Sequence, residues 1–562
     1  MPLEKASGYI SQLQFNNGQT INVEKDDIVV FVGPNNAGKS QSLKDIYALA
    51  KEKTPTTVIS DLKTTKQQGS VLAILESIAP AKVSGTTRFY DLHNDQVGYG
   101  PHLEDFFFSN SYFGSMRPAM IANLDTAARL NICRPPQAIS QSDPKKHPIH
   151  YAAFEGKYRR WLSDSFRKAF DEDLIPNTMF GATVPLCMGK PVILDGDYED
   201  EQARQEAYRS ILAEYKQVHN QGDGIKSFTG ILLYLMLDYY CTYLIDEPES
   251  FLHPPQARIM GQIIGETLSD GRQAFISTHS EDIIKGLIEV CPERIKLIRI
   301  TRDGDVNAFS VLNHEQFSAV WNDPLLRYSN IMSSLFHKTV VLCESDADCR
   351  FYSIVESHLQ HKAGKYSETL FIHCGGKHRM VKIIKALRAI NVTVKLIPDI
   401  DVLNDKDVFK GICEAFDIEW STLDSDYNSI VSNLHSPKEQ IETASAKRGI
   451  ENVFATVTNK YLSNREIDQI KDEVRTISKW KVLKDAGHTA IPRGDATIAF
   501  GRLNQTCKNN GIHIVTVGEL ECFIKEVGGH GPEWVNAVLE RYPELDDNVY
   551  SGVMDFIAGM NL

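Results

Sequence analysis

A short segment near the N-terminus has residue types and spacing suited to binding a polyphosphate. Gly33–Ser40 reads GPNNAGKS and fits the pattern G-x-x-x-x-G-K-[ST]. Backbone N–H groups of such a loop cradle phosphates, while Lys39 would add positive charge and Ser40 a hydroxyl ligand for Mg²⁺. A glycine-rich surface turn is the alternative. The residues expected to contact the nucleotide are Asn35, Asn36, Gly38, Lys39 and Ser40.

The sequence around this loop predicts the elements that would position it. The apolar run Ile28–Val32 before the loop is typical of a buried strand. The segment Gln41–Lys53 after it favours a helix. Strand, loop and helix in this order are what a phosphate loop requires, and the sequence therefore predicts ATP binding.

A second strand ends in acids that suit ATP hydrolysis. The predicted strand Cys241–Ile245 is followed by Asp246, placed to hold Mg²⁺ through its water shell, and by Glu247, placed to orient or deprotonate the attacking water. A third predicted strand, Gln273–Ser277, runs into His279, which is placed to contact the γ-phosphate. Strands capped by solvated polar residues are the alternative.

Another set of carboxylates follows strands in the second half of the chain. Glu344 ends the predicted strand Thr339–Cys343, with Asp348 four residues later, and Asp399 and Asp401 follow the strand Val392–Ile397. Such acids converge because ligands bind at the carboxyl edge of a parallel sheet. Hard oxygen ligands suit Mg²⁺ or Mn²⁺, and two such ions can hydrolyse a phosphodiester.

Composition excludes several classes of protein. The chain has 562 residues, enough for about three or four domains, and a hydrophobic content of 42% supports sizeable cores. No apolar run is long enough to span a bilayer, and Met1–Lys5 lacks the layout of a signal peptide. Ten scattered cysteines without a C-x-x-C pair fit a reducing cytoplasm, the expected location.

Charge gives two opposing indications about nucleic acid. The net charge of −13, taken over the whole chain, argues against nucleic acid as a partner. A basic stripe with helical spacing follows Gly375-Gly376, however, and either tracks phosphates or forms a solvated helix face. The stripe comprises Lys377, Arg379, Lys382, Lys385 and Arg388.

The order of predicted elements indicates two α/β domains. Strand–helix alternation occurs in both halves, and a parallel sheet is expected in each. We expect an ATPase domain over 1–325, with a helical insertion at about 103–218 that serves dimerisation or partner contacts. A second domain is expected over 335–562, and polar sequence marks a boundary near 325–337.

The nucleotide motifs resemble those of ABC-type, SMC-like ATPases. The segment Asp246–Pro254, DEPESFLHP, is similar to the corresponding segment of the soluble branch that includes the OLD (overcoming lysogenization defect) proteins. The resemblance implies two subunits that sandwich ATP, with a signature loop from the opposite subunit. Gly222–Ser227 is the candidate loop, and Gly224 would meet a phosphate. Gly222 replaces the usual serine, which favours slow turnover, with ATP acting as a clamp or gate.

The second set of motifs resembles the Toprim fold. Glu344, Gly375-Gly376 and Asp399-x-Asp401 occur in its order. In OLD-type Toprim domains a late glutamate returns to the metals, which here implies Glu521 first and Glu519 second, or else an exposed acidic turn. A late basic residue assists catalysis in relatives, and Lys484 and Arg493 both remain candidates.

An ABC-like ATPase followed by Toprim is the OLD-family arrangement. It implies an ATP-regulated, divalent-metal-dependent DNA endonuclease that acts in bacterial defence against phage as a homodimer or larger oligomer. Partners in the family include a helicase-like protein, or a retron reverse transcriptase with its RNA-linked DNA; no membrane is implied. The first alternative is an SMC-like, ATP-dependent DNA clamp whose Toprim half binds without cutting. A topoisomerase-like strand passer is the weaker alternative, because no segment marks a tyrosine nucleophile.

Overall fold

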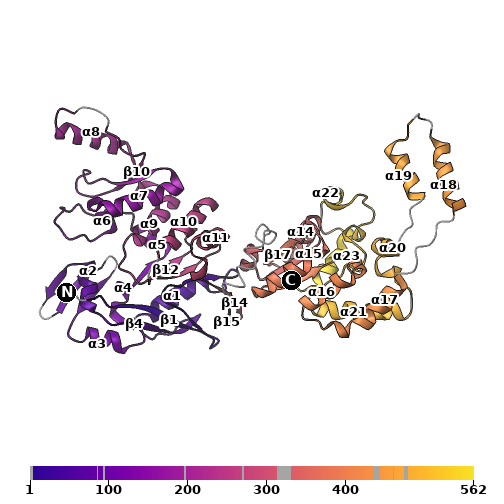
Figure 1. The fold of residues 1–562 in the computed structure, drawn as a ribbon, viewed down its shortest axis with the longest axis horizontal. Coiled ribbons are helices and arrows are strands. Elements are labelled where there is room, and N and C mark those ends of the chain that lie inside the picture. Colours follow the sequence, from indigo (N-terminus) through magenta and orange to yellow (C-terminus); the bar gives the residue numbers. More distant parts are fainter. Residues whose placement is uncertain are drawn as a thin grey trace. The chain divides into compact units, whose positions relative to one another are not determined.

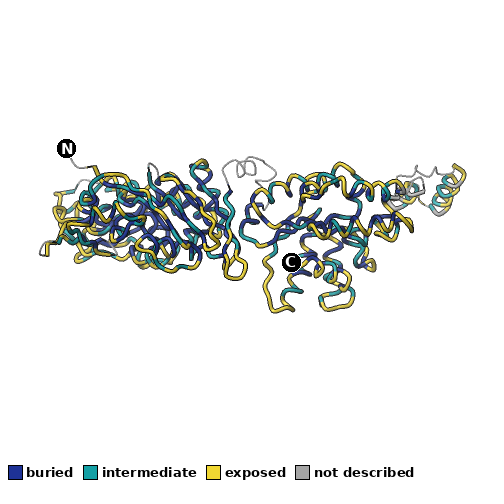
Figure 2. The backbone as a smooth tube through the Cα atoms, turned by 90° about the horizontal axis from the view of Figure 1, so that it is seen from below, coloured by how far each residue is buried: buried dark blue, intermediate teal, exposed yellow. Residues whose placement is uncertain are grey.

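A computed structural model describes residues 4–84, 87–92, 95–194, 198–268, 271–312, 331–434, 443–457, 459, 461–473 and 479–562. The chain divides into two compact units, Met1–Ala319 and Val320–Leu562 (Figure 1). Residues 325–330 of the boundary expected at 325–337 lie outside the described residues. Each unit has its own buried core, drawn in dark blue in Figure 2.

The first unit is organised around a six-stranded sheet that is parallel except at one edge. All residues of the two central strands are buried, which explains their continuous apolar sequences. The strands in spatial order are β15 (Val306–Leu312), β14 (Ile295–Asp303), β3 (Ile28–Val32), β13 (Gln273–Ser277), β12 (Thr242–Asp246) and β8 (Ile121–Leu124), with β15 antiparallel to β14.

The strand order brings the three nucleotide motifs to one edge of this sheet. β13 lies between β3 and β12, and all three run parallel. The phosphate loop follows β3, His279 follows β13, and Asp246 ends β12. Because the carboxyl ends of parallel strands share an edge, the histidine leaves the sheet between the loop and the acids.

Helix α1 (Lys39–Leu49) contacts both this sheet and an antiparallel sheet of β2 (Thr20–Asn22), β1 (Ser7–Phe15) and β4 (Ile59–Gln67). Apolar residues of α1 and both sheets form one core. The helix begins two residues earlier than predicted, directly in the phosphate loop. It also ends earlier, where the N–H groups of Phe113 and Gly114 bond the Ala50 carbonyl at 2.9 and 3.2 Å.

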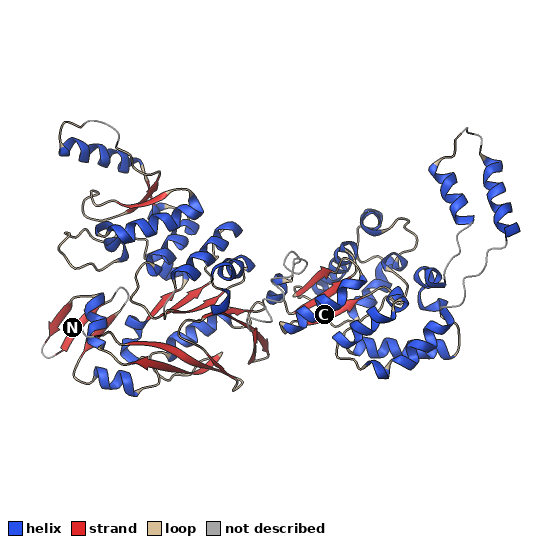
Figure 3. Ribbon diagram, in the orientation of Figure 1, coloured by secondary structure: helices blue, strands red, loops and turns tan. Residues whose placement is uncertain are grey.

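Helices predominate in the section 103–218, but it also contains strands that were not predicted. It contributes β8 to the central sheet, and it contains a second small sheet (Figure 3). These strands are only two to four residues long, which is too short for a clear periodic signal. The small sheet comprises β9 (Asp173–Pro176), β10 (Leu186–Gly189) and β11 (Lys216–Gln217).

Helices and a further hairpin sheet complete the first unit. Helix α9 is apolar on nearly all sides, and its residues Ser227–Leu235 are all buried. The remaining strands are β5 (Ala81–Ser84), β6 (Thr87–Asp91) and β7 (Gln96–Tyr99). The helices are α2 (Val71–Ile78), α3 (Leu103–Ser109), α4 (Arg117–Met120), α5 (Thr126–Asn131), α6 (Pro148–Phe154), α7 (Gly156–Phe170), α8 (Glu201–Glu214), α9 (Asp223–Leu235), α10 (Pro254–Thr267) and α11 (Glu281–Val290).

The second unit is built on a smaller parallel sheet. Its strands are ordered β17 (Thr369–His373), β16 (Thr339–Cys343) and β18 (Thr393–Ile397). An extended segment continues the sheet beyond β18, because Leu396 pairs in parallel with Ile512, and Asp399 with Val515. The closing element expected from the family resemblance therefore lies beside the Asp399–Asp401 segment.

Helices cover this smaller sheet. Val341 and Cys343 pack into a core with residues of α14, α22 and α23, while α15 contacts β18 and α16. The helices are α14 (Asp346–Lys362), α15 (Lys377–Ala389), α16 (Lys406–Ala415), α17 (Asp424–Leu434), α18 (Thr443–Thr456), α19 (Asn464–Glu473), α20 (Lys479–Ala486), α21 (Asp495–Asn509), α22 (Gly531–Arg541) and α23 (Ser551–Ala558). Among the described residues, no helix is long and apolar enough to cross a membrane.

Candidate active sites

The phosphate loop has a shape that its glycines make possible. Gly33 has a φ of 141°, and a Cβ there would overlap the carbonyl oxygen of Ile300. Gly38 has a φ of 101° at the start of α1. Lys39 Nζ donates to the carbonyl oxygens of Gly33 and Pro34, each at 2.8 Å. The loop thus folds around its own lysine, whose ammonium is the natural partner of a phosphate.

The acids of β12 are held in an uncommon backbone conformation. Glu247 has a φ of 47°, in the left-handed region, and its N–H donates to the carbonyl of Ser277 at 2.9 Å. Ser277 Oγ donates to the carboxylate of Asp246. Glu247 Oε1 lies 3.7 Å from His279 Nε2. Burial, together with the charge of Lys39, lowers the pKa of His279, which favours a neutral imidazole at this position.

A cleft of about 610 Å³ opens over the loop. Of the nucleotide-binding residues predicted for the same subunit, Asp246 alone does not line this cleft. The cleft also includes polar groups that sequence reasoning missed, because nothing in their spacing marks them. The lining residues are Asn35, Asn36, Gly38, Lys39, Ser40, Gln41, Lys44, Thr57, Val58, Glu247, His279, Arg302 and Asn307.

Two of the missed or unassigned polar residues shape the site. Asn307 on β15 donates through Nδ2 to the carbonyl of Ala37 at 2.7 Å, so this antiparallel strand holds the phosphate loop. Glu249 accepts a hydrogen bond from the N–H of His279 at 2.7 Å. Burial raises the pKa of Glu249. Glu249 therefore fixes the turn that carries the histidine.

The candidate signature loop forms the N-terminus of α9. Gly222 is the N-cap, and it offers no side-chain oxygen to the helix. A Cβ on Gly224 would lie 2.5 Å from the carbonyl oxygen of Phe251, so this position requires glycine for packing within its own subunit. Gly224 is not among the residues that line the cleft of its own chain. Its contact with a nucleotide stays a prediction about a second subunit.

In the second unit, three of the predicted metal ligands come together. Single carboxylate oxygens of Glu344, Asp399 and Asp401 lie within 4.8 Å of one another. Burial, then the negative charges of Asp348 and Glu344, raise the pKa of Asp399 well above its ordinary value. Burial and the charge of Asp401 likewise raise the pKa of Glu344. This mutual repulsion is what a divalent cation would relieve.

A second cluster adjoins the first across a cleft of about 300 Å³. It comprises Glu519, Glu521 and His530, whose ligand atoms also lie within 4.8 Å. His530 Nδ1 is 2.7 Å from Glu521 Oε1. Sequence reasoning missed His530, because a lone histidine before a Gly-Pro pair has no distinguishing pattern. Asp348 lines the same cleft with Glu344, Asp399 and the second cluster.

Asp348 also has a structural role. Its carboxylate accepts from the Ser345 N–H at 2.8 Å while Ser345 Oγ accepts from the Asp348 N–H at 3.3 Å, which caps α14. Burial raises the pKa of Asp348, and the charge of Glu521 contributes. Asp348 is thus placed beside both clusters without belonging to either set of converging ligand atoms.

Two lysines approach the carboxylates. Lys484 Nζ lies 2.9 Å from Glu519 Oε2 and 3.7 Å from Asp399 Oδ2. Burial opposes its charge, but the hydrogen bond to Glu519 and the charge of Asp399 raise the pKa of Lys484. Lys377 Nζ lies 3.5 Å from Asp401 Oδ2. Arg493, the other late basic candidate, is not among the residues that line the cleft.

The basic stripe lies on α15, and its members have different surroundings. Lys377 turns to Asp401, and Arg388 bonds the carbonyl of Ala415 at 3.0 Å and pairs with Asp417. The exposed members are Arg379, Lys382 and Lys385. Part of the stripe therefore supports the fold.

Comparison with known proteins relates the chain to ATPases and to a nuclease. Residues 191–284 match the family model described as "AAA domain, putative AbiEii toxin, Type IV TA system". The Old nuclease of Escherichia phage P2 is 22% identical over 323 residues, which are 54% of this chain and 48% of that protein. The chain thus spans about half the length of this curated relative. The match confirms the expected resemblance to the OLD family.

Solved structures of SMC heads are also similar. An SMC head bound to the C-terminal winged-helix domain of ScpA is 14% identical and covers 55% of this chain and 99% of its own, with a TM-score of 0.34. The SMC head domain of Thermotoga maritima is 14% identical and covers 56% and 100%, with a TM-score of 0.29. These scores are too low to carry an argument, and the α/β class follows from the two sheets described above.

Proposed function

We propose that this protein is an ATP-regulated, divalent-metal-dependent DNA endonuclease. The observation that carries the proposal is the convergence of Glu344, Asp399 and Asp401 beside Lys484. An all-carboxylate donor set suits Mg²⁺ or Mn²⁺. The raised pKa values of Asp399 and Glu344 support the same assignment, because a bound cation would offset their repulsion. The fold of this half would then be Toprim.

The side chains suggest how the phosphodiester would be cleaved. Divalent ions held by the carboxylates would supply an activated water and stabilise the leaving oxygen. Lys484, held between Asp399 and Glu519, is positioned to offset negative charge that develops on the phosphate. The second cluster would bind a further cation through Glu519, Glu521 and His530.

The first unit would supply the regulation. Lys39 and Ser40 would bind the phosphates and Mg²⁺, with Asp246 behind them, and Glu247 would orient water towards the γ-phosphate. Gly224 would contact ATP that is bound by a second copy of the chain, so the nucleotide would hold two subunits together as a homodimer. The protein would act in the cytoplasm, in bacterial defence against phage. Its candidate partners are a helicase-like protein, or a retron reverse transcriptase with its RNA-linked DNA.

The test is cleavage of supercoiled plasmid DNA with Mg²⁺ or Mn²⁺, with and without ATP. The double variant Asp399→Ala/Asp401→Ala should lose cleavage by at least about a hundredfold while ATP binding persists. Cleavage that survives this double change would overturn the assignment. A Lys39→Ala variant separates the roles, because it should lose the response to ATP and retain metal-dependent nicking.

An SMC-like DNA clamp is the second candidate. The observation that favours it is Gly222, which leaves α9 without the side-chain oxygen expected in a signature loop. Slow turnover would then hold two subunits closed around DNA. This candidate predicts ATP-dependent retention of circular DNA and no cleavage by the wild-type protein.

A further inference from the structure

Arg129 is a buried arginine that lies outside the nucleotide cleft. It belongs to α5 and is fully buried. Its NH1 group donates to the backbone carbonyl of Asp246, and NH2 donates to Thr126 Oγ1 at 3.2 Å. Within the described part of the chain, its Nε has no hydrogen-bond partner. Burying a guanidinium is costly, so its position here calls for a specific reason.

The contact with Asp246 restrains the peptide that leads into Glu247. The carbonyl of this peptide accepts from Arg129, and its N–H donates to Ser277 at 2.9 Å. Both ends of the peptide plane are therefore held. Glu247 adopts a left-handed φ of 47°, which is unfavourable for a side chain of its kind and persists only where the surroundings impose it. Arg129 is one of the two groups that impose it.

The backbone of the same residue touches the candidate signature helix. A Cβ on Gly230 of α9 would overlap the carbonyl oxygen of Arg129, so α5 and α9 are in direct backbone contact. One turn away, Cys133 Sγ lies 3.2 Å from the carbonyl oxygen of Lys226. The two helices are packed too closely for one to move without the other.

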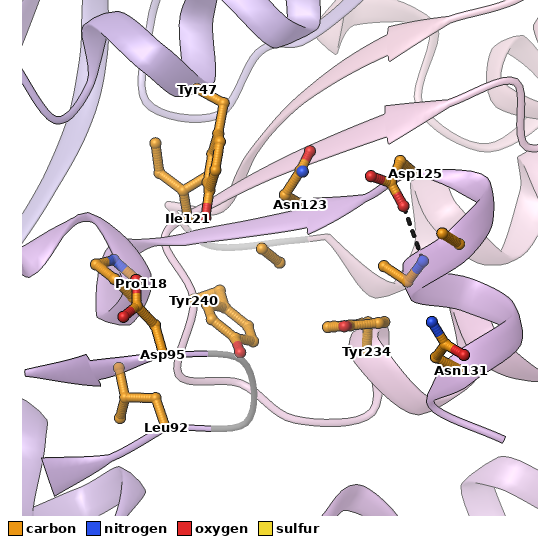
Figure 4. Close-up of a pocket in the computed structure, with 13 residues that line it drawn as sticks. Tyr47, Leu92, Asp95, Pro118, Ile121, Asn123, Asp125, Asn131, Tyr234 and Tyr240 are labelled. Carbon is orange, nitrogen blue, oxygen red and sulfur yellow. Dashed lines mark hydrogen bonds between the residues drawn. The ribbon is translucent and has the colours of Figure 1, made fainter. Parts of the chain in front are cut away.

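A cavity lies beside the contact between α5 and α9. It has a volume of about 450 Å³ and lies between α5, β8, α1 and α9 (Figure 4). Figure 4 shows Asp125, the N-cap of α5, and Asn131 of α5 on one side of it and Tyr240 on the other. Helix α5 is thus in direct backbone contact with α9 and also borders a cavity, which leaves room for a small joint displacement of the two helices.

We propose that Arg129 is a positioning residue that couples the signature helix α9 to Glu247. A nucleotide docked on the N-terminus of α9 would shift α9 and α5 together, and Arg129 would pass that shift to the Asp246–Glu247 peptide. Hydrolysis in one subunit would then depend on whether its own α9 is engaged. This inference rests on the proposed ATP site. It adds a connection between α9 and Glu247 within one subunit, through a residue that lines neither the nucleotide cleft nor the carboxylate cleft.

The test uses the full-length protein and measures ATP affinity and ATP turnover separately. Arg129→Met removes the donor but keeps an apolar side chain of similar reach. We expect kcat to fall by about 10- to 100-fold, because the general base loses its orientation. The dissociation constant of a fluorescent ATP analogue should change by less than about threefold, since no phosphate contact is lost. Arg129→Ala should recover turnover when guanidinium ion is added at millimolar concentration.

Gly230→Ala gives an independent test that keeps the arginine. The added methyl group would push α5 away from α9, and we expect the same loss of kcat with retained ATP affinity. The matched control is Gly156→Ala at the start of α7, where a Cβ meets nothing within 4 Å and both constants should match those of the wild type. If Arg129 were purely structural, Arg129→Met would lower ATP affinity, turnover and melting temperature together, which would overturn the coupling. An unchanged kcat in Arg129→Met or Gly230→Ala would overturn it as well. A wild-type protein that binds no ATP would instead refute the proposed function itself.

Discussion

The ammonium group of Lys484 lies 3.7 Å from the carboxylate of Asp399, although 84 residues separate the two in the chain. Helix α20 delivers the lysine, and the segment after β18 delivers the aspartate. The arrangement gives the carboxylate cluster a positive neighbour from the same subunit. It also distinguishes Lys484 from Arg493, which the sequence left as an equal candidate.

Replacing Lys484 should impair chemistry more than folding. Lys484→Met removes a charge that would face the developing negative charge of the phosphate, and cleavage should slow by about a hundredfold at saturating metal. Single-turnover cleavage of a labelled duplex measures this. Lys410→Met, at a partly exposed lysine on α16 that pairs with Glu414, is the matched control and should cleave at the wild-type rate. Equal rates for both variants would remove Lys484 from the site.

His530 should determine which metal the second cluster prefers. An imidazole ligand favours Mn²⁺ over Mg²⁺, so His530→Ala should raise the Mn²⁺ concentration for half-maximal cleavage by about tenfold and affect the Mg²⁺ reaction less. Metal titrations of cleavage measure both. His361→Ala, at an exposed histidine near the end of α14, is the control. A loss of similar size with either metal would contradict a ligand role for His530.

Restoring the serine of the signature loop should speed ATP turnover. Gly222 has φ −61° and ψ 158°, and a Cβ there meets nothing within 4 Å, so Gly222→Ser fits without strain. A hydroxyl facing the opposite nucleotide should raise kcat by at least about threefold. Gly222→Ala adds only the Cβ and should leave turnover unchanged. A rise in both variants would point to helix stability, not to the hydroxyl.

The pKa of Lys39 makes a prediction about pH. Burial lowers the pKa of Lys39 to about 8, opposed by Glu247 and Glu249. The ammonium is therefore present below pH 8 and is lost as pH rises through this value, and ATP affinity should fall above it. Calorimetric titration between pH 7 and 9.5 measures the trend, in buffers of equal ionic strength. Lys39→Met should bind weakly without this dependence, so an equal decline in that variant would assign the effect to another group.

The parts of the fold predicted best from the sequence are those where one physical rule dominates. Continuous apolar runs predicted β3 and β16, and glycine spacing predicted the phosphate loop. Parallel strand ends explain why Glu344, Asp399 and Asp401 meet. The four-residue strand β8 has no such signature, so its place in the central sheet went unrecognised.

The residues that were missed act through tertiary contacts. Arg129 stands in a six-residue helix, where a charged side chain is ordinarily exposed. Asn307 reaches the phosphate loop only because β15 folds back antiparallel onto β14. His530 joins Glu519 and Glu521 through a turn before α22. None of these positions has a periodicity or spacing that could reveal it.

The late segment beside β18 has a consequence for how the protein is made. Glu344 emerges from the ribosome long before Glu519, Glu521 and His530, and residues 345–518 must be translated before the first of these three. A nascent chain therefore holds its first carboxylates without the glutamates and the lysine that complete their surroundings. Chains released prematurely before residue 519 would keep Glu344, Asp399 and Asp401 but lack all three residues of the second cluster, so they would hold only part of the proposed metal site.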